Sequence, residues 1–423
     1  MKLYNLKHQE EVVAFTEALT KGMGRDRGLF FPMQIPALEN VESFLEMPFL
    51  ARSKRIIGAW LADELGQTVV DRLVENAFNF PVKVRRVDSA RSVLELFHGP
   101  TLAFKDFGAR FMAQCLNELA VDEKITILTA TSGDTGAAVA HAFYGLENIR
   151  VVILYPEGKI SSLQEKLFCT LGENIHTIAI SSDFDACQEL VKKAFVDEDI
   201  QSSMRLNSAN SINISRLLAQ ICYYFEAAAV VRTDELVVAV PCGNFGNLTA
   251  GLLAKAMGLP IKRFIAATNA NDTVPRYLKS GCWQPNPTIA TSSNAMDVSE
   301  PSNWPRVEVV LKTMGTGLNG LESVSVSEDE TKDSLKSLYR EGYLSEPHGS
   351  VAACALQKSL QGNEQGVFLA TAHPAKFKET VEQVLNEKVA LPPELEKVKN
   401  QKNLSDRMTA DFSLLKEYLL AER

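Results

Sequence analysis

The chain has 423 residues, of which 46% are hydrophobic and 23% charged, as in a soluble globular protein of two or three domains. Its net charge of -8 and the lack of a basic stripe in the sequence argue against nucleic-acid binding. Seven scattered cysteines without a C-x-x-C pair predict reduced thiols in a cytoplasmic protein, with neither a disulfide framework nor a metal site. The sequence contains no apolar N-terminal segment and no run of about 18 apolar residues, so we expect neither a signal peptide nor a membrane span.

In chain order, residues 1–80 are predicted to be helical with loops, and from about residue 82 short apolar runs alternate with helical patterns. Strands are predicted at Ile125–Ala130, Val151–Tyr155, His176–Ile180, Leu236–Val240, Phe264–Thr268 and Val367–Ala372. Helices are predicted from Ala137 and over residues 162–171, 186–196, 216–229 and 248–257. This alternation is typical of an α/β fold with parallel sheets covered on both faces. We expect a helical N-terminal region (1–80), a smaller α/β lobe (81–215) and a larger one (216–423), with an irregular insertion at 270–310 that walls an active site.

The segment His98–Arg110 places one lysine, Lys105, at the start of a helix whose apolar face is rich in phenylalanine. The residues of that face are Phe104, Phe107, Phe111, Cys115 and Leu119. A lysine removed from water has a lowered pKa and can act as a nucleophile or a base. The alternative is a lysine whose stem lies on the core and whose ammonium stays in solvent.

Three loops after predicted strands carry groups suited to anions, and in open α/β sheets ligands bind at such loops. Pro241–Asn247 combines glycines and asparagines before a helix, which favours a phosphate site but matches neither a P-loop nor a dinucleotide fingerprint. Thr131–Gly136 and Thr371–Pro374 offer small hydroxyls. The plainer alternatives are an ordinary strand-to-helix turn, a helix capped by Asp134, and a strand that ends at a proline.

Five motifs in order, from about Tyr4 to Leu391, resemble the threonine synthase family among the fold type II pyridoxal-phosphate-dependent enzymes. They are H-G-P-T-L-A-F-K-D, S-G-D-T-G, N-S-A-N-S-I-N-I-S-R, G-N-F-G-N and T-A-H-P-A-K-F. The resemblance is to the longer form found in enterobacteria and fungi. It implies a fold like that of the tryptophan synthase β chain and pyridoxal 5'-phosphate as the cofactor.

The resemblance also implies residue roles. Lys105 would bind the cofactor covalently and act as the catalytic acid and base. The cofactor phosphate would be held by Gly243, Asn244, Phe245 and Asn247, and the pyridine nitrogen by Thr371. The substrate carboxylate would lie beside Ser132, Asp134 and Thr135, and the substrate phosphate beside Asn210, Ser211, Arg216 and Lys159. Related sequences often carry serine at position 242 and aspartate at position 247, where this chain has Cys242 and Asn247.

The implied activity is the conversion of O-phospho-L-homoserine and water to L-threonine and phosphate, the last step of threonine biosynthesis, by a lyase acting on phosphates. Three alternatives stay open: a serine or threonine dehydratase, a lyase that forms 2-oxobutyrate from phosphohomoserine, and a catalytically silent binding module. We expect a small-molecule substrate, no nucleic-acid or membrane partner, and a monomer, with a dimer as the alternative.

Overall fold

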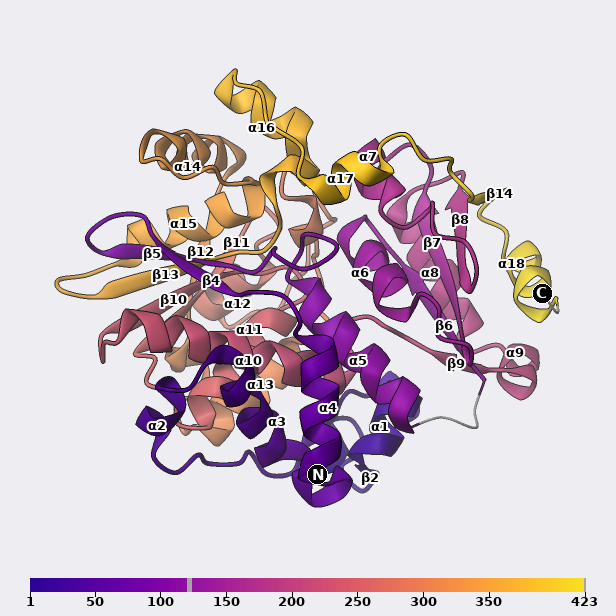
Figure 1. Ribbon diagram of the computed structural model, residues 1–423, viewed down its shortest axis with the longest axis horizontal. Coiled ribbons are helices and arrows are strands. Elements are labelled where there is room, and N and C mark those ends of the chain that lie inside the picture. The colour runs from indigo at the N-terminus through magenta and orange to yellow at the C-terminus, as the bar shows by residue number, and fades with distance from the viewer. Residues whose placement is uncertain (120–123, 422–423) are drawn as a thin grey trace.

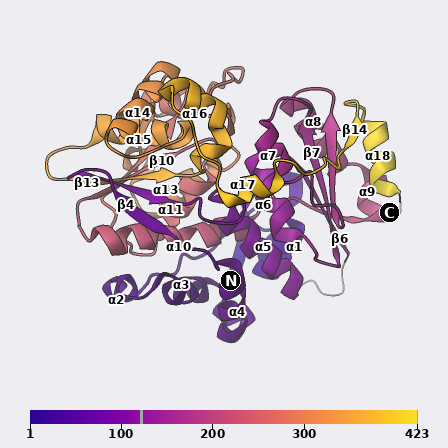
Figure 2. The same ribbon diagram turned by 45° about the horizontal axis from the view of Figure 1, so that its top comes forward.

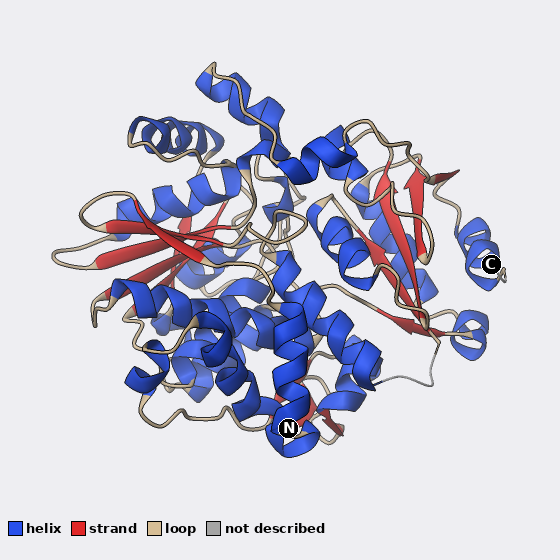
Figure 3. Ribbon diagram, viewed as in Figure 1, coloured by secondary structure: helices blue, strands red, loops and turns tan. Residues whose placement is uncertain are grey.

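The computed structural model describes residues 1–119 and 124–421 and shows two α/β lobes side by side, with N-terminal helices below them (Figures 1 and 2). Helices cover both faces of the two larger sheets (Figure 3). The predicted α/β architecture is therefore confirmed. The central strands are fully buried between helices and therefore read as largely apolar runs, as in Ile125–Ala130 and Leu236–Pro241.

The larger lobe contains a six-stranded sheet in the order β12-β11-β10-β13-β5-β4, parallel except for the antiparallel edge strand β4. Its strands are β4 (Lys83–Arg86), β5 (Arg91–Glu95), β10 (Leu236–Pro241), β11 (Arg263–Thr268), β12 (Glu322–Ser325) and β13 (Gln365–Ala370). Its helices are α10 (Ile214–Val231), α11 (Gly246–Ala256), α12 (Thr273–Ser280), α13 (Trp304–Thr313), α14 (Glu328–Arg340), α15 (Pro347–Ser359) and α16 (Lys378–Leu385). Short 3-10 turns lie at Asn294–Met296, Gly317–Gly320 and Pro374–Phe377.

The smaller lobe contains a five-stranded parallel sheet in the order β14-β8-β7-β6-β9. Its strands are β6 (Ile125–Ala130), β7 (Ile149–Pro156), β8 (Ile175–Ile180), β9 (Arg205–Asn207) and β14 (Asp406–Met408). Its helices are α5 (Lys105–Leu119), α6 (Asp134–Phe143), α7 (Ser162–Lys166), α8 (Phe184–Ala194), α9 (Glu198–Ser203) and α18 (Phe412–Leu420). Helix α17 (Pro393–Val398) lies on the connection that returns from the larger lobe (Figure 1).

The N-terminal region contains the helices α1 (Phe15–Lys21), α2 (Val41–Leu45), α3 (Phe49–Leu65) and α4 (Gln67–Ala77), as its predicted helical character requires. It also contains a sheet that was not predicted, formed by the antiparallel strands β1 (Lys2–Asn5), β2 (Val12–Ala14) and β3 (Phe30–Pro32). These strands have only three or four residues, which is too short for a period-2 pattern to stand out.

The predicted lobe boundaries need correction at the start of the smaller lobe and at the end of the larger lobe. Strands β4 and β5, assigned to the smaller lobe, pair in the larger sheet, where β5 lies beside β13. At the other end, β14 and α18 were assigned to the larger lobe, but β14 pairs with β8. Both errors arise because the partner strands are far apart in sequence, and local patterns carry no information about distant pairing.

Helix α10, at 18 residues, is the longest helix of the larger lobe. Its 18 residues have a mean hydropathy of 1.3, so by length and composition it could cross a membrane, although the sequence analysis predicted no such span. However, 78% of it is buried inside the protein, where it packs against α5 and α11. The helix is thus a core element, and its first turn lies at the cavity described below.

Candidate active site

A cavity of about 1240 Å³ lies where the carboxyl ends of the parallel strands of both lobes meet. It brings together twelve of the residues singled out from the sequence: Lys105, Ser132, Asp134, Thr135, Asn210, Ser211, Arg216, Gly243, Asn244, Phe245, Asn247 and Thr371. Lys159 is exposed and is not among the lining residues, so the structure does not support its place beside the substrate phosphate. The insertion contributes residues 285–288, 294–300, 302 and 305 to the lining, as expected of an active-site wall.

Lys105 is the first residue of α5 and extends into this cavity. The backbone that precedes it is held in place, because Leu102 adopts a left-handed φ of 58° and the Phe104 N–H donates to the Thr371 carbonyl at 2.8 Å. The Lys105 Nζ lies 3.8 Å from Asp134 Oδ2 and 5.0 Å from the centre of the Phe104 ring. Burial lowers the pKa of Lys105; Asp134 opposes this shift, whereas the charge of Lys376 adds to it.

Asp134 begins α6 and is held by Lys376, a residue for which the sequence analysis assigned no role. The fully buried Lys376 donates from Nζ to Asp134 Oδ1 and to the Thr101 carbonyl, both at 2.7 Å. Burial opposes ionisation, but Lys376 and Lys105 outweigh it and hold the pKa of Asp134 well below its usual range. Lys376 could have been noticed in the sequence as a lysine between Ala375 and Phe377.

The loop before α6 is shaped by a single hydroxyl. Thr131 Oγ1 accepts hydrogen bonds from the N–H groups of Gly133 (3.0 Å) and Gly136 (2.7 Å). Gly133 has a φ of 134°, and a Cβ there would lie 2.9 Å from Gln164 Nε2. Since the Asp134 carboxylate is engaged by two lysines, the hydroxyls of this loop, including those of Ser132 and Thr135, are the groups left to donate into the cavity.

The loop after β10 presents unpaired donors, as a phosphate site requires. Asn247 Oδ1 accepts from the hydroxyls of Tyr223 and Tyr224 at 2.6 Å, while its Nδ2 is buried with no partner in the described part of the chain. Phe245 adopts a left-handed φ of 60° at the start of α11, which turns the loop toward the cavity. A Cβ at Gly243 would lie 2.8 Å from the Ala295 carbonyl oxygen, so the close approach of the wall requires glycine there.

Arg216 supplies a buried positive charge on the first turn of α10. Its guanidinium donates to the Ala209 carbonyl and, at 3.5 Å, to the Lys105 carbonyl, while its Nε is buried with no partner among the described residues. Burial lowers its pKa to about 10, so it stays protonated at neutral pH. No carboxylate of the described chain forms an ion pair with it, which leaves its charge available to an anionic ligand.

The histidines have structural partners. His98 Nε2 lies 2.8 Å from a carboxylate oxygen of Glu95, and His141 Nε2 lies 2.8 Å from the Leu167 carbonyl oxygen. His348 lines the cavity; its Nδ1 lies 2.5 Å from Glu346, and its Nε2 accepts from the Ala295 N–H at 3.2 Å. This bond attaches the insertion to α15.

Comparisons with known proteins agree with this geometry. A family model described as "Pyridoxal-phosphate dependent enzyme" matches residues 92–372, and models for the threonine synthase N terminus and C-terminal region match residues 4–78 and 349–419. The threonine synthase of Haemophilus influenzae is 61% identical over 99% of this chain and 100% of its own length.

Solved structures agree as well. The crystal structure of threonine synthase from Escherichia coli superposes with a TM-score of 0.96 at 57% identity, over 99% of both chains. The PLP-bound threonine synthase from Brucella melitensis gives a TM-score of 0.93 at 31% identity, again over 99% of both chains. With matches along nearly its whole length, the chain belongs to the threonine synthase family of pyridoxal-phosphate-dependent enzymes.

Proposed function

We propose that the protein converts O-phospho-L-homoserine and water to L-threonine and phosphate at the cavity between its lobes, with the residue roles set out below. The observation that carries this proposal is the pairing of a buried lysine with two separate sets of anion donors in one cavity. One set lies on the loop after β10, and the other contains Arg216, Asn210 and Ser211. Two anion sets suit a phosphorylated cofactor together with a phosphorylated substrate.

The cofactor is pyridoxal phosphate, and the residues present fit it. The unpartnered Nδ2 of Asn247 and the glycine required at position 243 form a cradle for the cofactor phosphate, together with Asn244 and Phe245. Lys105 would bond covalently to the carbonyl carbon of the cofactor, and the Thr371 hydroxyl would lie beside the pyridine nitrogen. Pyridoxal phosphate, when bound, supplies an electron sink that stabilises negative charge at Cα and Cβ of an amino-acid substrate.

The chain's own residues bind the substrate and move protons. Arg216, with Asn210 and Ser211, holds the phosphate that must leave from Cγ, because a guanidinium matches phosphate oxygens in charge and shape. Ser132 and Thr135 donate to the substrate carboxylate. Lys105, whose pKa is lowered by burial, removes the protons at Cα and Cβ; it returns one to Cγ after phosphate has left and one to Cα after water has added at Cβ.

The alternative functions differ in which residues of this cavity they would require. A serine or threonine dehydratase acts on a substrate without a side-chain phosphate and gains nothing from a buried, unpaired guanidinium, which costs free energy to bury. A silent homologue would not need a lysine in the cavity whose pKa is lowered by burial. The phospho-lyase shares the whole site and differs only in whether water reaches Cβ.

The test is to incubate the purified protein with O-phospho-L-homoserine and quantify phosphate, threonine and 2-oxobutyrate together. We expect equimolar phosphate and threonine, abolished in Lys105→Ala. The matched control is Lys159→Ala, an exposed lysine outside the cavity, which should keep full activity. Phosphate with 2-oxobutyrate would instead assign the phospho-lyase, and no phosphate release would refute the proposal.

We further propose a monomer located in the cytoplasm. All seven cysteines are free and five of them are buried, as in proteins kept in a reducing compartment. One chain brings together the lysine and both sets of anion donors in the cavity. Sedimentation analysis should give the mass of one chain, and a dimer mass would refute the monomer.

A further inference from the structure

The segment Ser302–Arg306, at the start of α13, contacts both anion-binding loops: the loop after β10, which carries Asn244, and the loop that carries Ser211. Asn303 is fully buried; its backbone N–H donates to the Asn244 carbonyl at 3.2 Å, and its Nδ2 donates to Ser211 Oγ at 3.1 Å. Asn244 belongs to the proposed cofactor-phosphate loop and Ser211 to the proposed substrate-phosphate set. A single asparagine therefore contacts both loops.

Arg306 determines which way the Asn303 side chain faces. Arg306 is fully buried, and its guanidinium donates to Asn303 Oδ1 at 2.8 Å and to the carbonyls of Phe30, Ser211 and Ile212. A guanidinium has five donors and no acceptor. Only the oxygen of the Asn303 amide can face Arg306, so the amide nitrogen must face Ser211.

This orientation determines what Ser211 offers to a ligand. A hydroxyl has one proton to donate and lone pairs to accept with. Because Asn303 Nδ2 donates to the Ser211 oxygen, the bond occupies a lone pair and leaves the proton free for the cavity. Ser211 is thereby biased to act as a donor.

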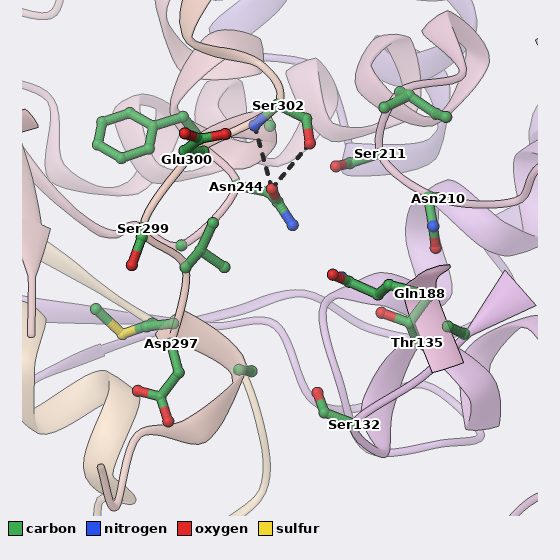
Figure 4. Close-up of a pocket in the computed structure, with 18 of the residues that line it drawn as sticks. Ser132, Thr135, Gln188, Asn210, Ser211, Asn244, Asp297, Ser299, Glu300 and Ser302 are labelled. Atoms are coloured by element: carbon green, nitrogen blue, oxygen red, sulfur yellow. Dashed lines mark hydrogen bonds between the residues drawn. The ribbon is translucent and has the colours of Figure 1, made fainter. Parts of the chain in front are cut away.

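Asn244 is oriented in the same sense by Ser302. The Ser302 backbone N–H and hydroxyl both lie 3.2 Å from Asn244 Oδ1 (Figure 4). A backbone N–H can only donate, so the Asn244 oxygen faces Ser302. Its amide nitrogen then points away from Ser302 into the cavity, as Figure 4 shows. Both anion loops therefore present donors.

We propose that Arg306, Asn303 and Ser302 are positioning residues that fix the hydrogen-bond polarity of Ser211 and Asn244, so that the cavity selects a phosphate dianion. A dianion carries only acceptors, so the protons that Ser211 and Asn244 turn toward the cavity match it, whereas a phosphate monoanion or a free hydroxyl brings a proton that these two groups, so oriented, do not accept. This inference rests on the proposed function, because it takes the ligand beside Ser211 to be the substrate phosphate.

The test reverses the polarity at Ser211 by Asn303→Asp in the holoenzyme. One carboxylate oxygen keeps the contact with Arg306, and the other accepts the Ser211 proton, so that Ser211 turns a lone pair toward the ligand. The probe is inorganic phosphate, measured as the inhibition constant against O-phospho-L-homoserine. We expect Asn303→Asp to weaken phosphate binding about tenfold, with the larger change in KM than in kcat.

A double-mutant cycle with Ser211→Ala separates polarity from the added charge. The carboxylate introduced by Asn303→Asp repels phosphate in both backgrounds, but the polarity effect needs the Ser211 hydroxyl. We expect the loss caused by Asn303→Asp to be markedly smaller in Ser211→Ala than in the wild type. Equal losses in both backgrounds would overturn the inference.

Two further variants allow the inference to be tested even if the Asn303→Asp protein binds its cofactor poorly. Asn303→Ser removes the donor to Ser211 without adding charge, and its loss should also shrink in the Ser211→Ala background. Lys159→Ala, which changes an exposed lysine outside the cavity, should change phosphate binding no more than about twofold. Wild-type holoenzyme that releases no phosphate from substrate would instead refute the proposed function, whatever the cycle shows.

Discussion

Replacing Lys376 by methionine isolates the charge that supports Asp134. The two side chains come from different lobes, since Lys376 lies in the turn after β13 and Asp134 begins α6. Methionine has nearly the length of lysine without its charge, so the packing of the stem is kept. The variant leaves a buried carboxylate that has lost its nearest cation.

The size of the expected stability loss follows from the partners that Asp134 keeps in the variant. Removing one member of a buried ion pair costs about 3–5 kcal/mol. Asp134 keeps a hydrogen bond from Gln164 Nε2 at 3.1 Å and the more distant Lys105 Nζ at 3.8 Å. Each of these offsets part of the loss, so we expect Lys376→Met to lower the free energy of unfolding by about 3 kcal/mol, the low end of that range.

The loss should depend on pH with a defined sign. The folded-state pKa of Asp134 lies below its unfolded value, so the stabilisation is fully present above about pH 4 and declines as the pH falls below that. The difference between wild type and Lys376→Met should therefore be largest near neutral pH and shrink in acid.

Urea unfolding followed by circular dichroism at several pH values measures this difference. Lys378→Met is the matched control, because Lys378 is only partly buried and pairs at 3.6 Å with Glu382 one turn away, so it should change stability by about 0.5 kcal/mol at most. Adding Asp134→Asn to Lys376→Met should restore part of the loss. A loss that is independent of pH and unaffected by Asp134→Asn would show that packing, and not charge, explains it.

Three other outcomes are expected. Arg216→Lys should raise KM for O-phospho-L-homoserine by about tenfold, because lysine lacks the planar fork, and an unchanged kcat/KM in steady-state assays would contradict its role. Thr371→Asp should shift products toward 2-oxobutyrate or transamination by favouring a protonated pyridine nitrogen; product analysis checks this, and unaltered product ratios would speak against it. The hydrogen bond from Arg263, which outweighs the effect of burial, lowers the pKa of Glu364 to about 2. Glu364→Gln should therefore lower the free energy of unfolding at pH 7, and that loss should fade between about pH 4 and pH 2. Urea unfolding measures it, and a loss that persists at pH 2 would refute this.

The sequence predicted those parts of the site that lie on single continuous segments. The strands Ile125–Ala130 and Leu236–Pro241 are runs of buried apolar residues, and the loops that follow them carry the predicted donors. Lys105 was found because its neighbours form one helical face. In each case the information is local.

The parts that were not predicted depend on contacts between distant segments. Asn303 touches Ser211 across 92 positions, and Lys376 touches Thr101 across 275. No periodicity or motif in one sequence indicates such a contact. Lys159 was misplaced for the same reason, because its sequence context suggested charge for the substrate but the fold leaves it exposed.

The strand order has a consequence for biosynthesis. Strand β13 lies between β10 and β5, and the strand β8 of the smaller lobe is covered by β14. While the chain emerges from the ribosome, one edge of β5 stays unpaired until β13 is synthesised about 270 residues later. One edge of β8 stays unpaired until β14, which ends at residue 408, is synthesised. Neither lobe can complete its sheet during translation, so chains stalled before β14 would expose an unpaired edge strand that invites aggregation and removal by quality-control proteases.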